Sequence, residues 1–139
     1  MSMKVLIADP DWYFLRQARD YLESRGDYVA HENSADPALR RAAHWRPDLI
    51  MVSAELPECC DGDLLSAFDK LQPRPAIILT AALERFDKAW RAWQRGGDEV
   101  IIKPVLHTSE FHVAVVAALK NSVCPRRPEL PGEVIAKSA

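Results

Sequence analysis

The chain has 139 residues, of which 48% are hydrophobic and 27% are charged, and its formal net charge is −2. This length predicts one domain with a short extension, and the composition is typical of a soluble globular protein. The small net charge gives no broad electrostatic basis for binding nucleic acid or an acidic membrane surface. No apolar run approaches the ~20 residues that span a bilayer, and no export signal is recognisable. We therefore expect a cytoplasmic protein with neither nucleic acid nor a membrane as its partner.

The three cysteines are Cys59, Cys60 and Cys124. An odd number without metal-ligand spacing argues against a disulfide framework or a zinc site. The adjacent pair leaves two interpretations open: a regulatory thiol pair in an exposed loop, or two small residues that fill that loop.

Short apolar stretches alternate with amphipathic ones along the chain. The expected strands cover residues 4–8, 28–32, 49–52, 76–79 and 99–102. Between and after them we expect a helix that ends at Arg25–Gly26, then helices over 36–46, 61–71 and 83–95, and a last one to Asn121. Asp36 and Ser109 are the expected N-caps of the second and last helices, with Pro37 as the first helical residue.

This alternation predicts a single doubly wound α/β domain with five parallel strands and five helices. Leu49–Val52 is apolar at every position, which indicates a central strand covered on both faces. We expect the domain to occupy residues 1–122. Residues 123–139 contain three prolines and no periodicity, which predicts a disordered C-terminal tail, either a linker or a partner-docking peptide.

Four of the apolar runs end in polar side chains: Asp9, Ser53, Thr80 and Lys103. In an open α/β sheet, ligands bind at the carboxyl ends of the strands, so these four side chains are expected to converge on one site. Asp11 follows closely after the first strand and is expected at the same edge.

With these strand ends and the Lys103–Pro104 pair, residues 3–121 resemble the receiver domain of two-component response regulators. The resemblance implies a flavodoxin-like sheet in the order 2-1-3-4-5 and a cis peptide between Lys103 and Pro104. In that family, acids after the first strand help to hold Mg²⁺, and an aspartate after the third strand accepts a phosphoryl group. A threonine or serine after the fourth strand senses the phosphoryl group, and a lysine before proline pairs with it.

Carried onto this chain, the resemblance matches Asp9 with the first acid, Thr80 with the sensing hydroxyl and Lys103 with the lysine. Pro10 stands where the second acid is expected, and Asp11 comes one position later. Ser53 stands where the phosphate-accepting aspartate is expected. A serine hydroxyl needs an adjacent base, and carboxylates with a pKa near 4 are poor bases for it. We therefore interpret the site as a degenerate phosphorylation pocket made of Asp9, Asp11, Ser53, Thr80 and Lys103.

The pocket has fewer acids than the family pattern, so its attraction for a divalent cation is expected to be weak. Glu55 adds a third carboxylate if it points inward, which makes Asp9, Asp11 and Glu55 a weak candidate ligand set for Mg²⁺. No other cofactor is expected. We instead expect that Lys103 pairs directly with Asp9 or Asp11 and that the pocket is a structural network.

Trp90 and Trp93 lie three residues apart on the fourth expected helix and therefore share a face. One of them is expected to fill the core. The resemblance implies that the face made by the fourth helix, the fifth strand and the fifth helix binds partners, and tryptophan is common among interface anchors. Val100, on that strand, stands where the family commonly has an aromatic switch residue.

The sequence is therefore interpreted as a stand-alone, atypical response-regulator receiver domain in phosphorelay-type signalling, without enzymatic activity of its own. It is expected to act by contact with a protein partner or a second copy. One alternative keeps the fold and makes the domain a working phosphorelay component that uses Ser53 or another acceptor. The other, a small flavodoxin-like enzyme, is opposed by the sequence Pro10-Asp11-Trp12, which offers no phosphate-binding loop.

Overall fold

The computed structural model describes residues 2–57 and 63–123. The cysteine pair Cys59–Cys60, the start of the third expected helix and the tail from residue 124 lie outside this part.

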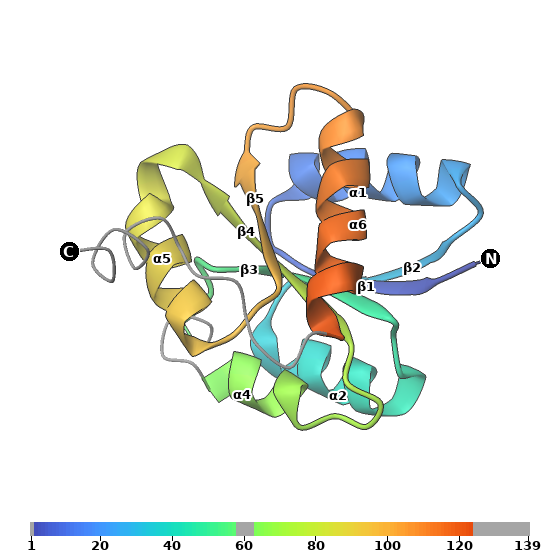
Figure 1. The fold of residues 1–139 in the computed structure, drawn as a ribbon, viewed down its shortest axis with the longest axis vertical. Coiled ribbons are helices and arrows are strands. Elements are labelled where there is room, and N and C mark those ends of the chain that lie inside the picture. Colours follow the sequence, from blue (N-terminus) through green and yellow to red (C-terminus); the bar gives the residue numbers. More distant parts are fainter. Residues whose placement is uncertain (1, 58–62, 124–139) are drawn as a thin grey trace.

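Five parallel strands form one sheet in the order β2-β1-β3-β4-β5 (Figure 1). This confirms the predicted doubly wound α/β architecture and the strand order that the resemblance implied. The strands are β1 (Lys4–Ala8), β2 (Tyr28–Glu32), β3 (Leu49–Ser53), β4 (Ala76–Ala82) and β5 (Glu99–Lys103). β3, β4 and β5 extend beyond the predicted ends, so Ser53, Thr80 and Lys103 are themselves strand residues. These residues pair with residues of the neighbouring strands, Ser53 with Thr80 and Lys103 with Ala82, and this pairing extends each strand beyond its apolar run.

Five helices are seen in the described ranges, labelled as in Figure 1. None of them combines the length and the apolar character that crossing a membrane requires. Their bounds are α1 (Trp12–Ser24), α2 (Ala35–Trp45), α4 (Asp63–Asp69), α5 (Phe86–Arg95) and α6 (Ser109–Ser122).

The helices cover both faces of the sheet, as Figure 1 shows. Successive side chains of a strand point to opposite faces, so β1 contributes to two cores. Val5 and Ile7 pack with residues of α1 and α6, whereas Leu6 and Ala8 pack with residues of α2, α4 and α5. β3 is buried at every residue, as predicted for a central strand.

Two predicted N-caps were wrong by one or two residues. α2 begins after Ser34, which places Asp36 and Pro37 inside its first turn. Proline is tolerated there because the first N–H groups of a helix have no intrahelical acceptor. α6 begins at Ser109 rather than after it. Its entry is fixed by the Glu110 carboxylate, which accepts hydrogen bonds from the backbone N–H groups of Leu106 and His107, both at 2.8 Å.

The fourth expected helix is divided into a short 3₁₀ turn, Leu83–Arg85, and α5. The peptide bond between Lys103 and Pro104 is cis, as the resemblance implied.

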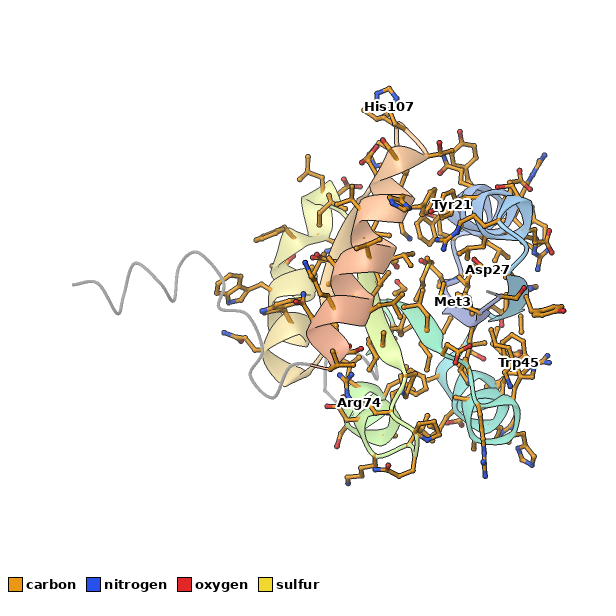
Figure 2. All side chains as sticks on the ribbon, turned by 45° about the vertical axis from the view of Figure 1, so that its right-hand side comes forward. Met3, Tyr21, Asp27, Trp45, Arg74 and His107 are labelled. Atoms are coloured by element: carbon orange, nitrogen blue, oxygen red, sulfur yellow. The ribbon has the colours of Figure 1, made fainter. Side chains whose placement is uncertain are left out.

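The amino-terminal edge of the sheet carries a repeated hydrogen-bond pattern that the sequence analysis missed. Asp27, Asp48 and Asp98 directly precede β2, β3 and β5. Each carboxylate accepts a backbone N–H from a neighbouring strand or its lead-in: Met3 for Asp27 (3.0 Å), Lys4 for Asp48 (2.9 Å) and Ile77 for Asp98 (2.8 Å). Figure 2 shows Asp27 beside Met3 at this edge. These contacts fix the strand starts and leave the opposite edge to carry the site.

Candidate functional site

The carboxyl-terminal edge of the sheet brings the predicted pocket residues together. Ser53 and Thr80 are direct neighbours across β3 and β4, and Lys103 ends β5. Asp9, directly after β1, is 2% exposed, and Ser53, Thr80 and Lys103 are 1%, 0% and 8% exposed. A polar group that is buried in this way must find its partners inside the protein.

Lys103 supplies the central contact of the pocket. Its Nζ lies 2.9 Å from Asp9 Oδ2 and 3.2 Å from Asp11 Oδ2. The Thr80 hydroxyl donates to Asp9 Oδ2 at 2.7 Å, a bond between two buried side chains. The prediction that Lys103 pairs with Asp9 or Asp11 is thus confirmed for both acids.

Asp11 has a second task in the local structure. As the N-cap of α1, its Oδ1 accepts a hydrogen bond from the backbone N–H of Phe14 at 3.1 Å. Burial opposes the ionisation of Asp11, but this hydrogen bond and the Lys103 charge outweigh it and hold its pKa below the ordinary value. The charged form of Asp11 is therefore favoured, and its carboxylate also caps the start of α1.

Ser53 lies at the end of β3 with its side chain turned inward. Its Oγ accepts a hydrogen bond from the backbone N–H of Glu55 at 3.2 Å. The backbone N–H of Ala54 donates to the carbonyl of Thr80 at 2.8 Å, which fixes the chain directly after the serine. Among the described residues, no carboxylate or imidazole forms a hydrogen bond with the Ser53 hydroxyl, so no general base is placed to activate it.

The pocket residues do not fit a divalent cation. Both oxygens of Asp9 and both oxygens of Asp11 accept hydrogen bonds from protein donors; for Asp9 Oδ1, the donor is the Asp11 backbone N–H at 2.9 Å. Mg²⁺ demands near-octahedral oxygen coordination, whereas an ammonium group already lies between these carboxylates. Glu55 is half-buried, and within residues 2–57 and 63–123 no three acidic, histidine or cysteine side chains are grouped to hold a metal ion.

One contributor to the pocket was missed in the sequence. The Lys103 Nζ lies 4.9 Å from the centroid of the Phe14 ring, within the range of a cation–π contact. Phe14 is also a buried residue of the core that α1 and α6 share. Its position one turn after Asp11 was the signal that places it beside the site.

The expected partner surface is hollowed on both sides of β5. A hollow of about 250 Å³ between α5 and β5 is lined by Phe86, Trp90, Trp93 and Val100, among others. A second hollow of about 420 Å³ lies between β5 and α6. Trp93 is 6% exposed and belongs to the core, which confirms that one of the two tryptophans fills it. Trp90 is half-buried and packs against the exposed ring of Phe86, with the ring centroids 6.5 Å apart.

The model of the response regulator receiver domain family matches residues 5–116. The chain belongs to this family. Among the relatives of this receiver is the transcriptional regulatory protein KdpE of Mycobacterium tuberculosis, 30% identical over 127 residues. That match covers 91% of this chain and 55% of KdpE. The regulatory protein PhoP for alkaline phosphatase synthesis in Bacillus subtilis is 29% identical, with 88% of this chain and 50% of PhoP covered.

Solved structures agree with the fold. A receiver domain protein from Clostridium thermocellum superposes with a TM-score of 0.70 at 23% identity, covering 88% of this chain and 97% of that one. A CheY-like receiver from Methanospirillum hungatei gives 0.73 at 22% identity, with coverage of 86% and 95%. The receiver described here spans about half the length of the two regulators named above. Its place in two-component signalling follows from the family.

Proposed function

We propose that this receiver signals by protein contact and does not accept a phosphoryl group. The observation that carries the proposal is the environment of Ser53, which is 1% exposed and has no base among its described contacts. The resemblance puts this serine where the family has its acceptor aspartate. A carboxylate is already an anionic nucleophile, but a hydroxyl must lose a proton to attack phosphorus. The hydroxyl of Thr80, which the resemblance matches with the family's sensing residue, donates its hydrogen bond to Asp9.

The test is intact-mass spectrometry after incubation with acetyl phosphate and Mg²⁺. The wild-type protein is expected to show no gain of mass, and Ser53→Ala serves as the matched control. Ser53→Asp tests whether an aspartate at this position is enough to restore phosphorylation. A gain of one phosphoryl group in the wild type that Ser53→Ala abolishes would contradict the proposal and support the phosphorelay alternative.

We further propose that contact with a protein partner or a second copy uses the surface formed by α5, β5 and α6. Several side chains support this: Phe86 is 51% exposed, Val113 65% and Val116 47%, beside the two hollows along β5. β5 is also an edge strand of the sheet, and exposed apolar side chains that gather on one side of a protein commonly mark an interaction site.

Val113→Asp tests this surface, with Tyr28→Asp as the control. Tyr28 is equally exposed, at 64%, but lies on β2, the outermost strand on the side of the sheet away from β5. Sedimentation velocity across a range of concentrations is expected to show self-association that only Val113→Asp weakens, if the partner is a second copy. A wild-type protein that stays monomeric throughout points to a different protein as the partner. Equal weakening by both variants argues against the surface itself.

A further inference from the structure

We propose that the Lys103 ammonium is the resident cation of this pocket and takes the place of a divalent metal ion. This goes beyond the proposed function, because a receiver that has lost its acceptor aspartate can still keep a metal site. The inference concerns what balances the charge of Asp9 and Asp11, whether or not any phosphoryl group is transferred.

The ammonium is held from three directions. It contacts Asp9 Oδ2 at 2.9 Å and Asp11 Oδ2 at 3.2 Å, and the ring of Phe14 lies below it at 4.9 Å from the centroid. Only 8% of the Lys103 side chain is exposed. A lysine at this depth is stable in its charged form only when its partners compensate for the lost hydration. Two carboxylates and an aromatic face provide that compensation.

The acids cannot turn toward a metal without loss elsewhere. Asp9 Oδ1 accepts the Asp11 N–H, which shapes the loop after β1, and Asp11 Oδ1 accepts the Phe14 N–H, which caps α1. Asp9 Oδ2 also accepts the Thr80 hydroxyl. A divalent ion would have to displace the ammonium and uncap the helix, and it would gain only two carboxylates. Pro10, with no polar side chain, cannot add a third ligand from this loop.

The lysine also links parts of the chain far apart in sequence. Asp11 and Lys103 are 92 residues apart, and Gln17 of α1 donates to the carbonyl of Val105, just beyond the end of β5. The pocket thereby joins the start of α1 to the end of β5. In this arrangement the loops at the carboxyl edge are held together by a side chain of the protein and need no bound ion.

The experiment measures metal binding without any phosphodonor, so its result is independent of the mass-spectrometry test. Wild-type protein is titrated with MnCl₂ and MgCl₂, and its Tm is compared with that in NaCl of the same ionic strength. We expect no metal-specific shift. Lys103→Met is expected to lose several degrees of Tm and to regain part of them, saturably, with Mn²⁺. Lys70→Met, an exposed lysine at the end of α4, is expected to behave as the wild type.

A saturable Mn²⁺ or Mg²⁺ shift in the wild type would overturn the proposal, as would a folded Lys103→Met protein that no divalent ion stabilises. If Lys103→Met does not fold, the side-chain ¹⁵Nζ resonance of Lys103 in the wild type decides. It is assigned by its loss in Lys103→Arg. A resonance unchanged by Mg²⁺ supports the resident ammonium, and a saturable change in its position contradicts it.

Discussion

Aspartates lie at both the amino-terminal and the carboxyl-terminal ends of the strands, here called the amino edge and the carboxyl edge of the sheet. The two groups of aspartates differ in the donors that they contact. At the amino edge, Asp27, Asp48 and Asp98 accept hydrogen bonds from backbone N–H groups of neighbouring strands. At the carboxyl edge, Asp9 and Asp11 also depend on the side chains of Lys103 and Thr80. A backbone donor is present whatever the neighbouring residue is, whereas a side-chain donor disappears with one substitution.

The side-chain contacts at the carboxyl edge are thus easier to alter by one substitution than the main-chain contacts at the amino edge. On our proposal, Ser53 replaces an acceptor aspartate at the carboxyl edge, a change of side chain that leaves the ladder hydrogen bonds in place. The amino edge offers no comparable freedom, because its acids fix where strands begin. Asp98 combines both kinds of donor: it accepts from the backbone N–H of Ile77 and from both terminal nitrogens of the Arg74 side chain, which Figure 2 shows near the end of α6.

The largest effect is expected at the amino edge. Asp98→Ala removes the buried acceptor of the Ile77 N–H and leaves the Arg74 guanidinium with Asp69 as its remaining acidic partner. Burial opposes the charged form of Arg74, but the hydrogen bond and charge of Asp98 outweigh it and raise the pKa of Arg74. Breaking a buried ion pair on one side costs about 3–5 kcal/mol, and because Arg74 is 29% exposed we expect the low end of that range, about 3 kcal/mol. Urea denaturation should show a loss of that size. Asp98→Asn keeps an acceptor and should lose less; a loss equal to that of Asp98→Ala would mean that charge alone matters here.

A smaller effect is expected at the carboxyl edge. Thr80→Val removes the hydroxyl that donates to Asp9, while Lys103 still pairs with that carboxylate. A hydrogen bond to a charged group contributes about 2 kcal/mol, and the same denaturation assay measures its loss. Thr80→Ser keeps the hydroxyl and serves as the control. If Thr80→Val proves as stable as the wild type, the two edges do not differ in the way described.

The smallest effect concerns the pH dependence of Asp11. Its pKa is held below the ordinary 3.8 in the folded protein, so its carboxylate stabilises the fold above that pH. The contribution disappears as the pH falls through the lowered folded value. Because 40% of the side chain is exposed, we expect less than about 1 kcal/mol. Asp11→Asn should flatten the acid limb of the stability profile. Identical acid limbs in the wild type and Asp11→Asn would contradict this assignment.

Local pattern was enough for much of the fold. The apolar runs located five strands, and their polar last residues predicted which side chains meet, because parallel strands align their carboxyl ends. Local pattern was less successful at the helix starts. Asp36 and Ser109 looked like caps, yet Ser34 and Thr108 hold those positions. Asp11, considered as a metal ligand or as a partner of Lys103, is also the N-cap of α1, and its place directly before the first helix was the overlooked signal.

The sequence by itself determined the doubly wound architecture and the pocket of Asp9, Ser53, Thr80 and Lys103, because both follow from the period and the ends of the strands. Only the tertiary structure decided which groups these side chains contact. Lys103 pairs with both acids, and the amino-edge aspartates bind backbone groups 21 to 44 residues away. Any aspartate before a strand looks alike in sequence. Its acceptor oxygens acquire a role only when the neighbouring strand brings an N–H within about 3 Å.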